Sequence, residues 1–167
     1  EASRLAVRLE LVTARIRQIM DLLALLPEVR EGDVAFCNRK FQSIHSYHPE
    51  FTGIYAVRTD GTVFAGSTPY PEGLNLARRS YFLQALRSGR LAVGEYAIDR
   101  VLKIPMVGYA RPVYGPSGET AAVLVIGFSL PYHRQNEPPD ASGLFSSSVL
   151  DAGGVRLYSH PKLERPE

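Results

Sequence analysis

The stretch FTGIYAVRTDGTVFAGS, residues 51–67, decides the fold of this chain. Apolar residues alternate on both sides of Thr59-Asp60-Gly61, and an Asp-Gly pair between two such runs is typical of a β-hairpin turn. The stretch therefore predicts strands over 51–58 and 62–67 that are joined by this turn.

The elements after the hairpin indicate how the sheet is completed. A loop rich in Pro and Gly precedes a helical pattern over 76–88, which Gly89 closes. Three further strand patterns follow, at 92–99, 105–114 and 120–130. The residues from 121 to 128 are almost wholly apolar, which is typical of a central strand covered on both faces. Two strands, a helical crossover and a three-stranded meander predict an α+β fold, a five-stranded antiparallel sheet with helices on one side.

Residues 2–26 carry a heptad pattern that predicts a long amphipathic helix ending at Pro27. Its apolar residues recur at alternating steps of four and three: Leu5, Leu9, Val12, Ile16, Ile19, Leu23 and Leu26. At about 1.5 Å per residue the helix spans about 40 Å, enough for a stalk between a membrane and a distal domain. The apolar seam either lies on its own domain or pairs with the same helix of a second chain.

An internal repeat predicts the start of a second module. Gly61, Val63, Ser67 and Pro69 recur at identical offsets from residue 153 to 161, after a polar linker. The sequence predicts four divisions: an N-terminal stalk or dimerisation helix (1–33), a module that holds the five-stranded sheet (34–132), a linker (133–145), and the first hairpin of a second, truncated module (146–167).

Composition and motifs exclude several function classes. The chain holds 19 basic and 17 acidic residues without a basic block, which argues against nucleic-acid binding. No apolar run is long enough to cross a bilayer. The chain starts at Glu1 without an initiator Met and is in a helical pattern by Leu5, so we interpret it as a fragment of a longer protein. Cys37 has no partner for an internal disulfide and is expected to be a small buried residue. His45 and His48 lack further ligands at a metal-binding spacing, and no nucleophile–base pair is evident. We therefore expect no enzymatic activity, no cofactor and no metal.

Several segments together resemble double-Cache sensor domains, which have a PAS-like sheet. The segment from Gly73 to Leu86, GLNLARRSYFLQAL, is similar to the family's "nl-x-x-R-x-Y/W-F/Y-x-x-al" pattern. Later strand segments agree as well: residues 93–96 (VGEY), 104–105 (IP), 110–113 (ARPV) and 123–127 (VLVIG). The resemblance covers residues 34–132 well and 146–161 weakly.

The resemblance implies a periplasmic or extracellular sensor of a bacterial inner-membrane protein: a histidine kinase, a cyclic-di-GMP enzyme or a chemoreceptor. Its ligand would enter between the sheet and the segment that carries Arg79, whose guanidinium matches a carboxylate. The residues expected to surround the ligand are Arg79, Tyr81, Phe82, Tyr96, Asp99, Tyr109 and Gly127. The amino-acid-binding branch has an Asp at the position of Gly127, so a small carboxylate or polar metabolite is favoured over an α-amino acid.

Two other functions remain open at this point. The chain could be a Cache module that binds no ligand and serves to form a homodimer or to hold a partner protein. It could also be a cytosolic PAS sensor, which the leading heptad helix and the repeated module disfavour. In both sensor interpretations the N-terminal helix is the candidate dimer interface, and membrane segments would lie outside this chain.

Overall fold

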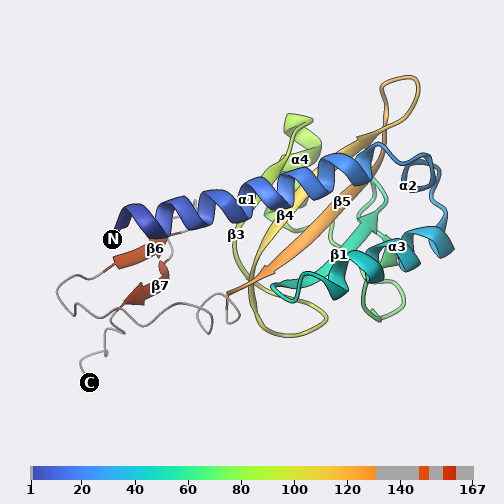
Figure 1. Cartoon of the computed structure of the whole chain (residues 1–167). Coiled ribbons are helices and arrows are strands. Elements are labelled where there is room, and N and C mark those ends of the chain that lie inside the picture. Colours follow the sequence, from blue (N-terminus) through green and yellow to red (C-terminus); the bar gives the residue numbers. More distant parts are fainter. Residues whose placement is uncertain (1, 131–146, 151–155, 161–167) are drawn as a thin grey trace.

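The computed structural model describes residues 2–130, 147–150 and 156–160. Five strands form one antiparallel sheet in the order β2-β1-β5-β4-β3 (Figure 1). Their bounds are Phe51–Val57 (β1), Val63–Gly66 (β2), Ala92–Ile98 (β3), Pro105–Tyr114 (β4) and Thr120–Ser129 (β5). The predicted sheet is confirmed, and β5 is its central strand, as the continuous apolar run indicated.

Four helices accompany the sheet in the described residues, and the residues at their N-termini explain where two of them begin. The helices are α1 (Ala2–Ala24), α2 (Pro27–Glu31), α3 (Val34–Ser46) and α4 (Ser80–Ser88). The heptad helix ends at Ala24, and Pro27 starts α2, because a proline is tolerated in the first helical turn. Asp33 caps α3 by accepting a hydrogen bond from the Phe36 amide at 2.9 Å.

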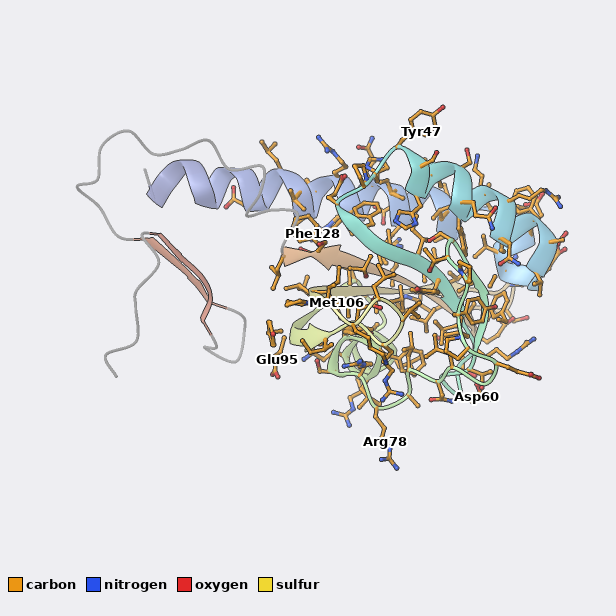
Figure 2. All side chains as sticks on the ribbon, turned by 90° about the horizontal axis from the view of Figure 1, so that it is seen from below. Tyr47, Asp60, Arg78, Glu95, Met106 and Phe128 are labelled. Atoms are coloured by element: carbon orange, nitrogen blue, oxygen red, sulfur yellow. The ribbon has the colours of Figure 1, made fainter. Side chains whose placement is uncertain are left out.

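Helices cover both faces of the sheet, so the prediction of helices on one side is wrong. One apolar core joins α1, α2 and α3 to one face, and includes Phe41 and Ile126. A second core joins α4 and the segment before it to the other face, and includes Phe82 and Val125. Figure 2 shows Phe128 on the α1 side of the sheet and Met106 on the other. The side chains of β5 are apolar on both faces of the sheet. Each face is therefore covered by helices, which bury its apolar surface.

The apolar seam of α1 lies on the chain's own sheet. Ile16 and Leu23 are 0% and 1% exposed, and Val12 and Ile19 pack beside them. Figure 1 shows α1 crossing in front of β4 and β5. Of the two interpretations of the heptad pattern, packing on its own domain holds for residues 12–26.

Helix α4 begins at Ser80, four residues later than the sequence predicts. The main chain before it is bound elsewhere: the Leu76 amide donates to the Gly61 oxygen at 2.8 Å, and the Ala77 amide donates to Asn75 Oδ1 at 2.8 Å. These bonds hold the segment against the hairpin turn instead of in a helix. Arg79 is consequently the N-cap residue, with an extended backbone at φ −79° and ψ 134°.

A second hairpin is present in the C-terminal part. Strands β6 (Ser147–Leu150) and β7 (Arg156–His160) pair antiparallel, where the repeat placed the start of a second module. The predicted linker, 133–145, lies outside the described residues, and the four domain divisions stay predictions. Among the helices that the structure describes, none is long and apolar enough to span a bilayer.

Candidate ligand-binding site

A small cavity lies between the sheet and the two segments that precede α4 and follow β3. Its volume is about 20 Å³, enough for about one water molecule. It is lined by Tyr55, Leu74, Leu76, Arg79, Tyr81, Asp99, Arg100, Val101, Met106, Val125 and Gly127. We call this set the Arg79 pocket. Four of the seven predicted site residues meet there: Arg79, Tyr81, Asp99 and Gly127.

The protein uses only some of the hydrogen-bond donors of the Arg79 guanidinium. Its Nη2 donates to the main-chain oxygen of Ile98 at 2.8 Å. Its Nε is buried and has no hydrogen-bond partner among the described residues. Leaving a buried donor unpaired costs about 1–3 kcal/mol. A carboxylate oxygen placed in the pocket would remove that cost.

A second arginine mirrors the first across the pocket. Arg100 donates from Nη1 to the main-chain oxygen of Asn75 at 3.0 Å. Arg79 therefore reaches from the segment before α4 to the end of β3, and Arg100 reaches back from the segment after β3. The two bonds tie the two covering segments to each other.

Asp99 lines the pocket and also shapes its own loop. Its Oδ1 accepts from the amides of Val101 and Leu102, each at 2.7 Å, and its Oδ2 accepts from Thr52 Oγ1 at 2.8 Å. The side chain is buried, with the residue 5% exposed. Lys103, in the same loop, has φ 59°, the left-handed region that costs energy for a side-chain-bearing residue. Asp99 thus holds a strained loop closed over the pocket.

Two buried tyrosines form apolar walls with polar tips. A Cβ on Gly108 would lie 2.3 Å from Tyr81 Cδ1, so the Tyr81 ring lies directly against the strand at a position that only glycine permits. The Tyr55 hydroxyl is 2.9 Å from Thr68 Oγ1. Burial raises the pKa of Tyr55 and of Tyr81 to about 12. Both phenols are therefore neutral hydrogen-bonding groups at physiological pH.

Gly127 forms the floor of the pocket. A Cβ at this position would lie 2.1 Å from Thr52 Oγ1 and 2.8 Å from Met106 Sδ. The acidic side chain that the amino-acid-binding branch has at this position cannot fit without moving both neighbours. The packing of β1, β4 and β5 around Gly127 thus leaves no space for an acidic side chain at this position.

Three predicted site residues lie elsewhere. Tyr109 is on the α1 face, where its hydroxyl is 3.1 Å from Thr13 Oγ1. Tyr96 pairs with Val107, a residue of the α1-face core, and is 40% exposed. Phe82 is buried in the core beneath α4 and does not line the cavity. Placing Tyr96 and Tyr109 in the pocket is therefore corrected: residues paired across strands share a face, and theirs is the α1 face.

Sequence reasoning missed Tyr55, Arg100 and Met106 as lining residues. Tyr55 pairs with Val125 across β1 and β5, on the same face as the pocket. Alternation along the predicted strands was the available signal for Tyr55, since neighbouring strand residues point to opposite faces. No comparable signal existed for Arg100, because it lies in a loop.

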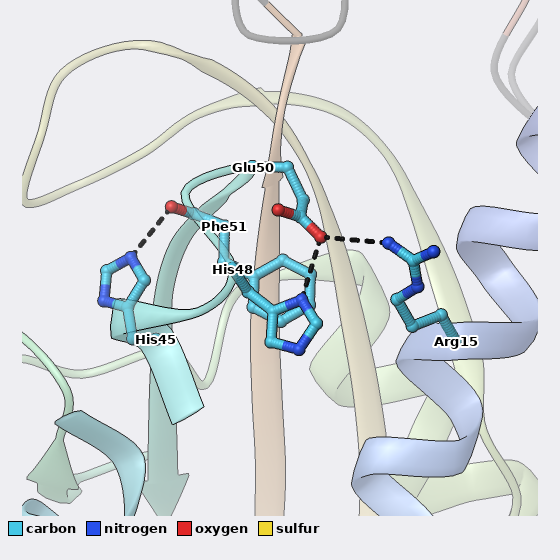
Figure 3. A network of polar contacts seen from close by, with 5 residues as sticks. All are labelled: Arg15, His45, His48, Glu50 and Phe51. Atoms are coloured by element: carbon cyan, nitrogen blue, oxygen red, sulfur yellow. Dashed lines mark hydrogen bonds and ion pairs between the residues drawn. The ribbon is translucent and has the colours of Figure 1, made fainter. Parts of the chain in front are cut away.

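His45 and His48 contact protein groups (Figure 3). His45 lies 3.0 Å from the Phe51 oxygen through Nε2 and 3.0 Å from Ser67 Oγ through Nδ1. His48 Nδ1 is 3.0 Å from Glu50 Oε1, which is also 3.7 Å from Arg15 of α1. The described part of the chain contains no cluster of three or more His, Cys, Asp or Glu side chains that could hold an ion.

Cys37 is buried, as predicted. Burial, with smaller contributions from Asp33 and Glu28, raises the pKa of its thiol to about 11. The thiol is therefore protonated and unreactive at neutral pH.

Comparison with known proteins relates the chain to sensor proteins. No protein-family model matches it. Sporulation kinase D of Bacillus subtilis is 26% identical over 98 residues, covering 56% of this chain and 19% of the kinase. The chain thus spans about a fifth of that relative's length.

Solved structures share the fold. The sensor domain of the V. cholerae histidine kinase DctB superposes with a TM-score of 0.69 at 19% identity, covering 80% of this chain and 55% of that one. The ligand-binding domain of the Campylobacter jejuni chemoreceptor Tlp3, in complex with L-norvaline, gives 0.73 at 14%, covering 98% and 68%. That of the Pseudomonas aeruginosa chemoreceptor PctC, in complex with GABA, gives 0.57 at 25%, covering 78% and 58%. This chain has the Cache, PAS-like fold of the sensor domains of histidine kinases and chemoreceptors.

Proposed function

We propose that this chain is the extracytoplasmic sensing part of a membrane-bound signal transducer, and that the Arg79 pocket binds a small carboxylate or a similar polar metabolite. The observation that carries the proposal is the buried, unpartnered Nε of Arg79 beside a cavity on the sheet. The fold shared with kinase and chemoreceptor sensor domains supports it. Output domains and membrane segments belong to the longer protein, and we assign no catalysis to this fragment.

The chemistry of the pocket fits a carboxylate. Guanidinium groups bind carboxylates through two parallel N–H donors, and Arg79 has an unused donor at Nε while Nη2 serves Ile98. Tyr55 and Tyr81 supply apolar walls that bury a small ligand at low entropic cost. Bonds from the ligand to Arg79 would compete with the bond to Ile98.

Ligand binding requires the covering segments to move. The cavity volume of about 20 Å³ is far below the roughly 300–1,000 Å³ of ordinary ligand pockets. A ligand that enters must loosen the ties that Arg79 and Arg100 make between the two segments. Binding is thereby coupled to a conformational change, which a sensor needs, because a ligand shifts an equilibrium only through its differential affinity for two states.

An α-amino acid fits this pocket less well than an acid without an ammonium group. The Tlp3 and PctC domains were solved with L-norvaline and GABA, which carry both groups. Here Gly127 offers no carboxylate, and Asp99 already accepts three hydrogen bonds. A buried ammonium group without a full partner is costly.

Dimerisation through α1 is the second part of the proposal, with a different surface from the heptad seam. The seam is covered by the sheet, whereas Leu11, Leu22 and Leu25 are 63%, 60% and 76% exposed. With the exposed Ala14, Leu11 and Leu22 recur at helical spacing on the outward side of α1, and Leu25 follows directly after its end. This outward stripe is where a second copy would pack.

A second candidate function is a scaffold that binds no small molecule. The small cavity favours it, because side chains nearly fill the pocket. The partly exposed Arg79 with its unpaired Nε favours the sensor.

A thermal-shift panel of organic acids and amino acids decides between the two. We expect at least one small carboxylate to raise the melting temperature, and Arg79→Gln to abolish the shift. Arg78→Gln is the matched control, because Arg78 is adjacent and exposed and points away from the domain (Figure 2). No shift with any acid supports the scaffold, and stabilisation by amino acids alone contradicts the assigned ligand class.

A further inference from the structure

We propose that a groove between α1 and β4, on the face of the sheet opposite to the Arg79 pocket, is a second site that binds a small organic dianion. Its volume is about 420 Å³, within the roughly 300–1,000 Å³ range of small-molecule sites. The residues that carry the argument are Arg17, Asp21, Arg90, Leu91, Arg111 and Pro112. This site is independent of the proposed function of the Arg79 pocket.

The groove concentrates positive charge that the protein leaves uncompensated. Three arginines, Arg17, Arg90 and Arg111, line the groove together with one carboxylate, Asp21. The exposed side chains of Arg17 and Arg90 make no hydrogen bond or ion pair with another described residue. The excess of two positive charges creates a local potential that attracts an anion of charge two.

Arg111 pairs with Asp21 by charge without satisfying all its donors. Nη1 of Arg111 lies 2.7 Å from Asp21 Oδ1, a contact at ion-pair distance. That contact lacks hydrogen-bond alignment, and both Asp21 Oδ1 and Arg111 Nε are buried without a hydrogen-bond partner in the described chain. Arg111 Nε is thus a second unused guanidinium donor, and an anionic oxygen in the groove would accept from it.

One wall of the groove is apolar, which selects an organic anion over a bare inorganic one. Leu91 lines the groove and packs against the α1-face core. Tyr114 also lines the groove, and its hydroxyl donates to the Gly89 oxygen at 2.6 Å. A dianion with a small apolar body would place its charge on the arginines and its body on this wall.

The position of the groove gives the site a consequence for α1. Arg17 and Asp21 belong to α1, whereas Arg111 belongs to β4, over which α1 lies (Figure 1). An anion that bonds Arg17 and Arg111 together would fasten α1 to the sheet. A ligand of this groove would therefore favour the arrangement in which α1 stays docked.

Calorimetric titration with phenyl phosphate tests the site, because this probe joins a dianionic group to an apolar ring. We expect saturable binding with a Kd below about 1 mM, and an affinity about tenfold weaker in Arg17→Gln and in Arg111→Gln. Arg17 is exposed, so its variant folds even if loss of the Asp21 pair destabilises Arg111→Gln. Arg79→Gln and Arg78→Gln are expected to bind as the unmodified chain does.

Three results would overturn the proposal. Titration without saturation at about 1 mM excludes a specific site. Equal weakening by Arg78→Gln shows a general charge effect. Loss of binding in Arg79→Gln alone places the probe in the other pocket, whereas failure of the Arg79 pocket to bind any acid leaves this test unaffected.

Discussion

The guanidinium of Arg79 holds the main-chain oxygen of Ile98 at 2.8 Å, and this bond joins the segment before α4 to the end of β3. Arg100 makes the opposite bond to Asn75 at 3.0 Å. The Arg79 guanidinium, which we propose binds the ligand, therefore also holds together the two segments that cover its pocket. A ligand that occupies Arg79 changes how the two segments are held.

Replacing Arg79 by Lys is expected to weaken binding of the best carboxylate at least about tenfold. A lysine ammonium is a point donor and lacks the planar fork that presents two parallel N–H donors to a carboxylate. Calorimetric titration measures the change, with Arg78→Lys as the control. An Arg79→Lys variant that binds with unchanged affinity would contradict the fork geometry.

Replacing Gly127 by Ala is expected to destabilise the domain by about 1–3 kcal/mol. The new methyl group would overlap Thr52 Oγ1 and Met106 Sδ, and overpacking a core costs this much. Urea unfolding measures the free energy. Combining it with Thr52→Ala should recover part of the loss, since that change removes the nearest clash; strict additivity of the two losses would argue against the contact.

Substitutions at two adjacent leucines of α1 are expected to affect domain stability and self-association separately. Leu23→Ala is expected to cost about 2–5 kcal/mol of unfolding free energy, because Leu23 is 1% exposed in the core. Leu22→Ala, at a residue 60% exposed, should change it by less than about 0.5 kcal/mol. Sedimentation equilibrium of Leu22→Glu tests the outward stripe: a weaker dimer is expected, and an unaltered one would exclude this stripe.

Alkaline pH is expected to destabilise the domain because two buried tyrosines would have to ionise. The pKa of Tyr55 and of Tyr81 rises from 10.0 to about 12 on burial. Because the folded state favours the protonated phenols, their contribution is complete below pH 10 and is lost as pH rises towards 12. Urea midpoints across this range should fall, and less steeply in Tyr81→Phe. A midpoint independent of pH would contradict the burial of these phenols.

Periodicity predicted the sheet well because strand alternation and turn residues are local signals. The Asp60-Gly61 turn predicted the pairing of β1 with β2, the apolar run predicted that β5 is central, and the family resemblance predicted Arg79 as a pocket residue. Periodicity could not tell which surface covers an apolar seam, so Ile16 and Leu23 were equally compatible with a partner helix. Their actual neighbours come from strands about 100 residues later in the chain.

The site was predicted less completely because it depends on register and loops. Gly127 pairs with Gly108, so Tyr109, the next residue, must point to the other face. Only the register in which β4 pairs with β5 shows which face Tyr109 points to, and that register depends on the tertiary structure. The late start of α4 depends on the Leu76 amide bond to Gly61, a contact between two loops that no local pattern encodes.

A structure of the chain bound to the strongest carboxylate from the thermal-shift panel tests the central claim most directly. The account predicts one carboxylate oxygen on Nε of Arg79, with the segments around Asn75 and Arg100 displaced outward. A ligand bound elsewhere, or an Arg79 guanidinium that still bonds only Ile98 while the acid is present, would contradict it.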